Sequence, residues 1–270
     1  MCELLALSCR LPTRLTSSLT ALASHARGES RNRDGWGLAF YQGRDVALYR
    51  GTEAADASAM VRWLEANGPP TRLSLGYIRH ATQGQIELAN TGPYLRELNG
   101  RIHGFAHNGN LTRLFEEAEA PTGHYRPVGA TDSELAFCRL LSGMERLSTP
   151  PHALPSLEAR LEVVAEMAAT LRRLGPANFL YADGDTLFAH ADRRLHPDTG
   201  RVEPPGLYRL ACPRQSASEL LERPRSPQSD QSQRAMLLSS VPLSEGGWQP
   251  LPRGSVIAVR DGELVAERRI

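Results

Sequence analysis

The sequence predicts an α+β fold built from layered sheets. Short apolar or alternating segments indicate many strands, and segments with apolar residues at helical spacing indicate several helices. These elements do not follow the regular strand–helix alternation of a doubly wound fold, so we expect stacked sheets with helices packed against them. No clear boundary divides the 270 residues, and a chain of this length can bury a substantial core. We therefore expect residues 1–270 to form a single domain.

The N-terminal half begins with a predicted strand. Residues 2–8 form an apolar run without Gly or Pro, which is typical of a buried strand. Leucines at helical spacing predict a helix over 14–27, which Gly28 would end. By the same reasoning we expect a hairpin of strands 38–41 and 46–50, a helix over 54–66, and strands over 73–79 and 102–107.

The C-terminal half contains the clearest helix of the chain, over 157–174. Its apolar residues form one stripe, and Gly175-Pro176 should stop it. Another helix should begin at an N-cap at Thr131 or Asp132, and residues 135–141 should form its apolar face. Further strands are predicted over 178–181, 186–191, 207–211, 235–241, 255–260 and 263–268. Residues 213–234 are rich in Ser, Gln, Arg and Pro, which predicts a mobile surface loop.

Composition and charge exclude several classes of protein. The chain is 41% hydrophobic and 23% charged, which is ordinary for a globular domain, and its net charge of +1 gives no basic field for nucleic acid. The apolar run at the N-terminus is too short for a signal peptide, and no run approaches the ~20 residues that span a membrane. The four cysteines form no CxxC pair and no zinc-type cluster with histidine. We expect reduced thiols in a cytoplasmic protein without metal or cofactor.

Cys2 is the first candidate for chemistry. A small second residue permits removal of Met1, and removal would give Cys2 a free α-amine beside its thiol. The thiolate is the reactive form of cysteine, and an amine of near-neutral pKa can serve as its base. On position alone, a cysteine that merely happens to fall second is the better interpretation. A catalytic role for Cys2 therefore depends on partners elsewhere in the chain.

Three polar motifs follow at the ends of predicted strands or at the start of a predicted helix. They cover residues 79–84, 107–110 and 131–134. Each has a plain structural interpretation: Arg79 as a surface charge, Asn108-Gly109 as a turn, and Asp132 as a helix cap.

One kind of chemistry uses all three motifs together with a cysteine. In acyl transfer from an amide, a thiolate attacks the carbonyl while hydrogen-bond donors stabilise the oxyanion. The side chain of Asn108 and the backbone N–H of Gly109 can supply such donors. If the substrate is an α-amino acid amide, Arg79 can bind its carboxylate through a bidentate fork and Asp132 can bind its ammonium group.

The chain resembles the class II, N-terminal nucleophile, glutamine amidotransferases, and within them the stand-alone bacterial, YafJ-like type. The resemblance is carried by five segments that occur in the family's order and rough spacing, namely residues 1–5, 34–37, 79–82, 107–109 and 131–134. Any one of these segments alone is weak evidence, whereas the combination is highly specific.

The resemblance implies a four-layer αββα sandwich of two antiparallel sheets flanked by helices, the Ntn-hydrolase fold. It implies these site residues: Cys2 as nucleophile with its own α-amine as base, Asn108 and Gly109 as the oxyanion hole, Arg79 with Thr82 nearby for the substrate carboxylate, and Asp132 for the substrate ammonium. The loop 34–37 would line the pocket, and the family pattern assigns no role to Gln83. We interpret His80 and His107 as structural or supporting residues.

The resemblance also implies the reaction. We expect hydrolysis of the γ-amide of glutamine through a thioester, with ammonia released to an ammonia-accepting synthase partner. A relative of this architecture acts on a γ-glutamyl amide in ergothioneine synthesis, so a γ-glutamyl amide hydrolase of a specialised metabolite is an alternative. An inactive glutamine-binding or scaffold subunit is a further alternative, which retention of Met1 would favour.

Overall fold

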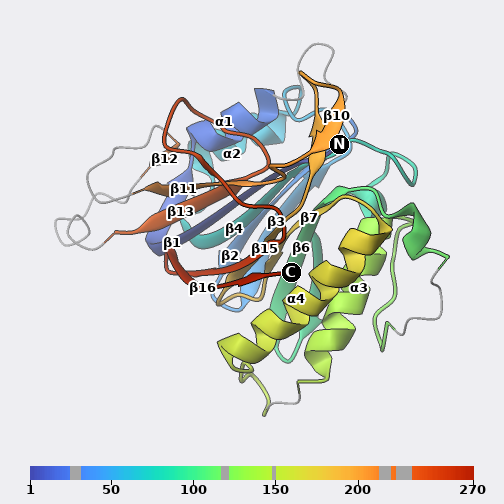
Figure 1. The fold of residues 1–270 in the computed structure, drawn as a ribbon. Coiled ribbons are helices and arrows are strands. Elements are labelled where there is room, and N and C mark those ends of the chain that lie inside the picture. The colour runs from blue at the N-terminus through green and yellow to red at the C-terminus, as the bar shows by residue number, and fades with distance from the viewer. Residues whose placement is uncertain (25–31, 117–121, 148–149, 213–219, 223–232) are drawn as a thin grey trace.

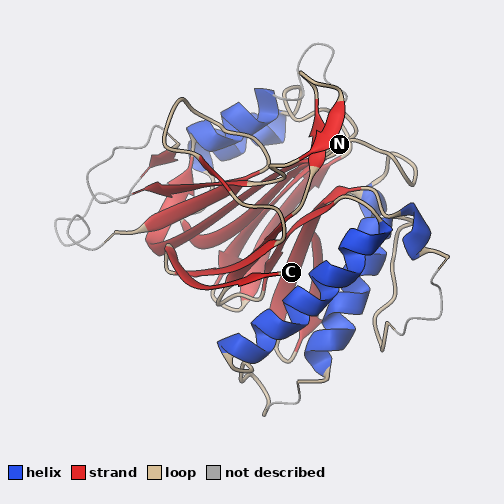
Figure 2. Ribbon diagram, viewed as in Figure 1, coloured by secondary structure: helices blue, strands red, loops and turns tan. Residues whose placement is uncertain are grey.

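The computed structural model describes residues 1–24, 32–116, 122–147, 150–212, 220–222 and 233–270. Within these residues two antiparallel sheets are stacked face to face, and helices cover the outer face of each (Figures 1 and 2). No helix in these ranges is both long and apolar enough to cross a membrane.

The first sheet has β1 at its centre. Its order is β14-β11-β13-β1-β4-β2-β3, with β12 also paired to β1. Its strands are β1 (Glu3–Leu15), β2 (Trp36–Gln42), β3 (Asp45–Gly51), β4 (Thr71–Ile78), β11 (Tyr208–Cys212), β12 (Leu221–Glu222), β13 (Ala235–Ser239) and β14 (Gln249–Pro250). Helices α1 (Ser17–Ser24) and α2 (Ala59–Asn67) cover its outer face (Figure 1).

The second sheet has the order β16-β15-β8-β7-β6-β5. Its strands are β5 (Tyr94–Leu98), β6 (Arg101–Gly109), β7 (Ala177–Ala182), β8 (Leu187–Ala191), β15 (Ser255–Arg260) and β16 (Glu263–Arg269). Helices α3 (Asp132–Glu145) and α4 (Leu157–Leu174) pack on its outer face (Figure 1). Strands β9 (Arg194–His196) and β10 (Arg201–Glu203) form a separate ribbon, and short 3-10 helices span Leu88–Asn90 and Thr112–Leu114.

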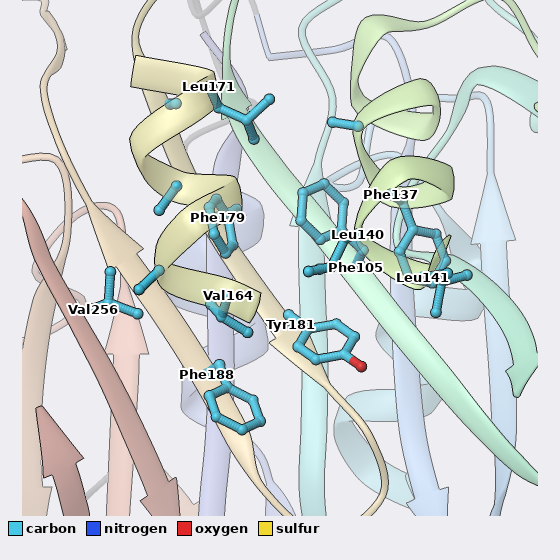
Figure 3. Packing of buried hydrophobic residues seen from close by; sticks show 14 of the residues in the cluster. Phe105, Phe137, Leu140, Leu141, Val164, Leu171, Phe179, Tyr181, Phe188 and Val256 are labelled. Atoms are coloured by element: carbon cyan, nitrogen blue, oxygen red, sulfur yellow. The ribbon is translucent and has the colours of Figure 1, made fainter. Parts of the chain in front are cut away.

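Strand alternation divides the buried side chains among three apolar layers. In β1, Leu4 and Ala6 face the second sheet, whereas Leu5 and Leu7 face the layer of α1 and α2. On the second sheet, the outward-facing aromatic residues pack beneath α3 and α4; they include Phe105, Phe179, Tyr181 and Phe188 (Figure 3). Three apolar layers between four structural layers confirm the expected αββα sandwich.

The predicted boundaries are correct for α4, which ends at Leu174 with Gly175 as its C-cap. Of the two predicted N-caps of α3, Thr131 is the one that the structure shows, and the helix continues to Glu145. The predicted helix over 54–66 is too long, because α2 begins only at Ala59, where the Ser58 side chain accepts the Val61 N–H. The sequence did not indicate β5, β9, β10, β12 or β14, and β12 lies within the segment predicted as a loop over 213–234.

The prediction of a helix over 14–27 is wrong at its start. Strand β1 continues to Leu15, because Thr13 pairs with Thr71 and Leu15 pairs with Leu221. The pairing register with β4 shifts between Ser8 and Thr13, so the strand passes Pro12 without ending. Tertiary pairing thus overrides the leucine spacing, and residues 25–27 lie outside the described part of the chain. Most of the loop predicted over 213–234 also lies outside it, except 220–222 and 233–234.

The topology brings the polar motifs to one end of the sandwich. Glu3 pairs with Ile78, so the start of β1 lies beside the end of β4 and the motif that follows it. The Asn108 side chain near the end of β6 reaches across from the second sheet and donates to the Cys2 carbonyl. The two sheets therefore meet at Cys2.

Candidate active site

The Cys2 sulfur is enclosed by groups from the first sheet. Its side chain is buried, and Sγ lies 3.0 Å from the Tyr77 hydroxyl and 3.4 Å from the backbone N–H of His80. Burial raises the pKa of the Cys2 thiol above its ordinary value. The hydrogen bonds with Tyr77 and His80 oppose this rise in pKa. The resting group is thus a protonated thiol, and its reaction as a nucleophile requires a base.

Asn108 is fully buried near the end of β6. Its side-chain N–H donates to the Cys2 carbonyl, while its Oδ1 has no hydrogen-bond partner among the described residues. The Asn178 side chain on β7 donates to the Asn108 carbonyl at 3.1 Å. Strand pairing and Asn178 therefore fix the backbone of Asn108, and its amide is directed at Cys2.

Position 109 has no room for a residue larger than glycine. A Cβ at this position would overlap the Pro176 carbonyl and approach the His107 ring at 2.5 Å. The Asn110 N–H donates to that carbonyl at 3.3 Å, and neighbouring N–H groups of a strand point to opposite edges. The Gly109 N–H therefore points away from β7. The pairing of β6 with β5 ends at Phe105, so it does not extend to Gly109.

Arg79 is buried just after β4 with 2% of its surface exposed. Its guanidinium donates only to backbone carbonyls, those of Gln83 at 3.1 Å, Gly84 at 3.3 Å and Asp34 at 3.5 Å. Among the described residues, no carboxylate lies within ion-pair distance of Arg79. A buried guanidinium held only by carbonyls keeps a positive charge that suits a bound carboxylate.

Asp34 supports the loop that follows Arg79. Its carboxylate accepts the Ala81 N–H at 2.7 Å and lies 3.6 Å from the His80 ring. The backbones of residues 34–35 and Arg79 are also joined by hydrogen bonds of 3.2 and 2.8 Å. The segment that the sequence placed at the pocket wall is therefore attached to the arginine motif.

Asp132 lies at the first position of α3 and is buried. Its carboxylate accepts the backbone N–H groups of Leu111 at 2.6 Å and Ser133 at 2.8 Å. These bonds fix both oxygens, and the positive end of the helix dipole favours the negative charge. The carboxylate lies near enough to Cys2 for its charge to contribute to the raised pKa of the thiol. Each oxygen retains a lone pair for a bound ammonium group.

His107 lies on the other face of β6, where Nδ1 is 2.9 Å from the Ser133 hydroxyl. Burial lowers the pKa of its imidazole below the ordinary value, although the Asp132 charge opposes that change. A neutral His107 thus contacts the residue beside Asp132, in a supporting position.

The structure brings Cys2 and Asn108 into direct contact, and the residue after Arg79, His80, contacts the Cys2 sulfur. The Asp132 carboxylate lies near enough to Cys2 to affect the pKa of its thiol. Thr82 is exposed to solvent, and its role beside Arg79 stays a prediction. Gln83, to which we assigned no role, donates to the Asn110 side chain at 2.9 Å and so links two of the motifs.

Sequence reasoning missed several polar residues around Cys2. Tyr77 is one, and strand alternation could have placed it on the inner face of β4 with Leu75. A second group anchors the residue after Cys2: the buried Glu3 carboxylate pairs with Arg194 at 2.8 Å and accepts from Ser240. The available signal was Glu3, an acidic residue at the start of an apolar run. The sequence did not show its partner, because Arg194 lies in β9, far along the chain.

Among the described residues, no group of three or more His, Cys, Asp or Glu side chains is arranged to hold a metal ion. The chemical groups of the site are the Cys2 thiol, the Asn108 amide, the Arg79 guanidinium and the Asp132 carboxylate.

The chain is similar to known proteins over nearly its whole length. The family described as "Glutamine amidotransferases class-II" matches residues 1–269. YafJ of Escherichia coli, which carries the name of a glutamine amidotransferase, is 35% identical over 202 residues, covering 75% of this chain and 77% of that protein. A Haemophilus influenzae protein with a similar name is 29% identical over 277 residues, covering 99% of this chain and 87% of that one.

Solved structures show the same fold. A crystal structure titled as a predicted glutamine amidotransferase from Pseudomonas aeruginosa has a TM-score of 0.69 at 29% identity and covers 98% of this chain and 99% of that one. The phosphoribosylpyrophosphate amidotransferase of Bacillus subtilis has a TM-score of 0.61 at 15% identity and covers 99% of this chain but 49% of that chain, a likeness of fold alone. By the match over nearly its whole length and by its identity to YafJ, the chain belongs to the class II glutamine amidotransferases.

Proposed function

We propose that the chain hydrolyses the γ-amide of glutamine through a thioester on Cys2, formed after Met1 is removed. The observation that carries this proposal is that the buried Asn108 amide donates to the backbone carbonyl of the buried Cys2, the residue whose thiol is the nucleophile. Near this contact lie a guanidinium without a carboxylate partner among the described residues and a fixed carboxylate, as the two ends of an α-amino acid require.

Substrate binding would use Arg79 for the carboxylate and Asp132 for the α-ammonium group. Both groups are buried and held by hydrogen bonds, so little conformational freedom is lost when substrate binds. Two fixed points orient the side chain of the substrate and direct its γ-carbonyl at Cys2.

In the first step the sulfur attacks the γ-carbonyl carbon, and its proton passes to the α-amine of the processed Cys2. The side-chain N–H of Asn108 and the backbone N–H of Gly109 receive the oxyanion. Collapse of the tetrahedral intermediate breaks the C–N bond, and the amine proton moves to the leaving nitrogen, which departs as ammonia. In the second step water adds to the thioester carbonyl, the C–S bond breaks, and glutamate leaves with the thiol restored.

A γ-glutamyl amide hydrolase is the second candidate, because the recognition groups all address one end of the substrate. Arg79 and Asp132 bind the α-amino acid end, which glutamine shares with every γ-glutamyl amide. No residue assigned above contacts the leaving amine. The same acyl chemistry would thus serve glutamine with an ammonia-accepting synthase partner, or a larger γ-glutamyl amide without one.

The nucleophile is tested by comparing glutamate release by Cys2→Ala and Cys9→Ala variants with the parent. Cys9 is the matched control, since it is also a buried thiol of β1 but bonds backbone carbonyls away from the site. We expect activity to vanish in Cys2→Ala and to persist in Cys9→Ala. Equal glutamate release by Cys2→Ala and parent would disprove the assignment. If the measured mass of the parent shows that Met1 has been removed and the parent still releases no glutamate, the scaffold alternative is favoured.

The substrate is tested with a panel of γ-glutamyl amides that differ in the leaving amine. Glutamine as the best substrate supports ammonia release, whereas glutamine as the poorest supports the γ-glutamyl amide hydrolase. Labelling with 6-diazo-5-oxo-norleucine should modify Cys2 and leave Cys138 and Cys212 unmodified, because both of these are buried away from the site.

A further inference from the structure

The Tyr77 hydroxyl is directed at the Cys2 sulfur. The two atoms lie 3.0 Å apart, and both side chains are buried on the inner faces of neighbouring strands. No other hydrogen bond within the described residues involves this hydroxyl. The phenol ring packs in the apolar layer between the sheets and against Gly92, contacts that a phenylalanine ring would also make. The hydroxyl itself thus serves only the sulfur.

The protonation state of this hydroxyl determines what it can do. Burial raises the pKa of Tyr77 well above its ordinary value, and the neighbouring Cys2 adds to that rise. The phenol therefore stays protonated over the pH range in which enzymes work. A neutral hydroxyl can donate one hydrogen bond, and a thiolate is a stronger acceptor than a thiol.

We propose that Tyr77 is a catalytic residue, whose hydroxyl donates a hydrogen bond to the Cys2 thiolate. The inference rests on the function proposed above and adds a residue that contacts the reacting atom. When the thiol proton moves to the α-amine, the sulfur is left as an anion in a buried site. The backbone N–H of His80, at 3.4 Å, is a second and longer donor to the same sulfur.

The same bond assists the breakdown of the thioester. As water adds to the carbonyl carbon, the C–S bond breaks and its electron pair remains on sulfur, which again becomes a thiolate beside the Tyr77 hydroxyl. Tyr77 keeps its own proton throughout, and the α-amine returns the proton to sulfur. The hydroxyl thus stabilises the anion formed before acylation and the leaving group of deacylation.

The test is Tyr77→Phe, which removes the hydroxyl and keeps the ring. The readout is the pH dependence of Cys2 alkylation by iodoacetamide in the processed protein, with the modified peptide identified by mass. We expect the midpoint of the alkylation profile to rise by about one pH unit, since a hydrogen bond to a charged group is lost. For glutamate release we expect kcat to fall on the order of tenfold while KM stays within about twofold.

Tyr41→Phe is the matched control. Tyr41 is equally buried in the layer between the sheets, but its hydroxyl donates to the Ala182 carbonyl at 3.0 Å and does not contact Cys2. Its alkylation midpoint should match that of the parent. An unchanged midpoint in Tyr77→Phe, or the same rise in Tyr41→Phe, would overturn the inference.

A second variant covers the case in which Tyr77→Phe folds poorly. Replacement of Tyr77 by 3-fluorotyrosine keeps the shape of the side chain and makes the hydroxyl a stronger donor, so the midpoint of Cys2 alkylation should fall rather than rise. An alkylation midpoint that does not fall would contradict the proposed role of Tyr77. Failure of this inference is distinguishable from failure of the proposed function. Loss of activity in Cys2→Ala with an unchanged midpoint in Tyr77→Phe rejects Tyr77 alone, whereas full activity in Cys2→Ala rejects the function itself.

Discussion

The two sheets contribute unlike halves of the site and hold them by unlike means. The first sheet presents Cys2 and fixes the next residue, Glu3, through a buried ion pair with Arg194. The second sheet presents Asn108 and fixes it through the neutral side chain of Asn178, which also bonds the backbone of Asp192 and Arg193. Both anchors end in the short segment 192–194, so one short segment is bonded both to the residue after the proposed nucleophile and to the neighbour of the proposed oxyanion donor.

This contrast predicts different consequences of losing each anchor. A charge left alone in a buried site destabilises the whole fold, because it cannot regain its hydration. A lost neutral hydrogen bond costs much less and allows the group that it held to move. We therefore expect the charged anchor to affect stability first and the neutral anchor to affect catalysis first.

The largest expected effect is that of Arg194→Gln. It leaves the Glu3 carboxylate buried without its ion-pair partner, and we expect a loss of about 3–5 kcal/mol in the free energy of unfolding. Urea unfolding monitored by circular dichroism measures this value. Arg72→Gln is the control: it breaks a pair with Asp261 in which both side chains are exposed, and it should cost about 1 kcal/mol or less. Equal losses in both variants would contradict the contrast, and adding Glu3→Gln to Arg194→Gln should recover part of the loss.

The next effect is a loss of unfolding free energy as pH falls, which we expect to come from histidines of the second sheet. His190 on β8 is buried and neutral, and burial lowers its pKa to about 4. In the unfolded chain its pKa is about 6.5, so between those values the unfolded state binds a proton that the folded state does not. The stability that His190 contributes is full above pH 6.5 and falls as pH drops to 4, by on the order of 3 kcal/mol.

His190→Gln should flatten this fall in stability. Burial also lowers the pKa of His103 and His107 on β6, so part of the fall should persist. No strand of the first sheet that the structure describes contains a histidine. Unfolding free energies at pH 7 and pH 5 test this, with His124→Gln at an exposed site as the control. A His190→Gln protein that loses as much stability as the parent over this range would count against the prediction.

The smallest effect on stability should come from Asn178→Ala. It removes the bond to the Asn108 carbonyl and leaves the Asp192 N–H unpaired, which we expect to cost about 1–3 kcal/mol in unfolding free energy. Its effect on catalysis should be clearer, a fall in kcat on the order of tenfold with KM little changed, because the amide of Asn108 loses its exact position. Steady-state kinetics of glutamate release measure both constants. A change confined to KM would show that Asn178 does not position the Asn108 side-chain amide for catalysis.

Much of the fold was predictable from the sequence because its signals are local. The apolar stripe and Gly175 define α4, and Thr131 caps α3 through its own side chain. The misplaced start of α1 shows the limit of local signals, since residues 10–15 follow a pairing with β4 and β12 rather than their own helical spacing.

The candidate site was predictable to the extent that its residues lie in the family's motifs, and the roles of these residues stay predictions. Cys2, Asn108, Gly109, Arg79 and Asp132 were all named from such segments. Tyr77 and the Glu3–Arg194 pair were not, because their roles arise from contacts between residues 75 and 191 positions apart. Thr82 was named from the same kind of segment and is exposed to solvent, and its role stays a prediction.

The unequal lengths of β5 and β6 have a consequence for how members of this family are compared. Strand β6 continues past the point where β5 stops, and the Gly109 N–H lies in that unpaired overhang. If β5 were extended at its beginning by an insertion, its carbonyls could pair with that N–H and occupy it. Every motif residue would then be present while the proposed oxyanion donor was lost. The identity of the motif residues alone is therefore an incomplete criterion of activity among relatives. The length of β5, a strand that contains no motif residue, should be compared as well.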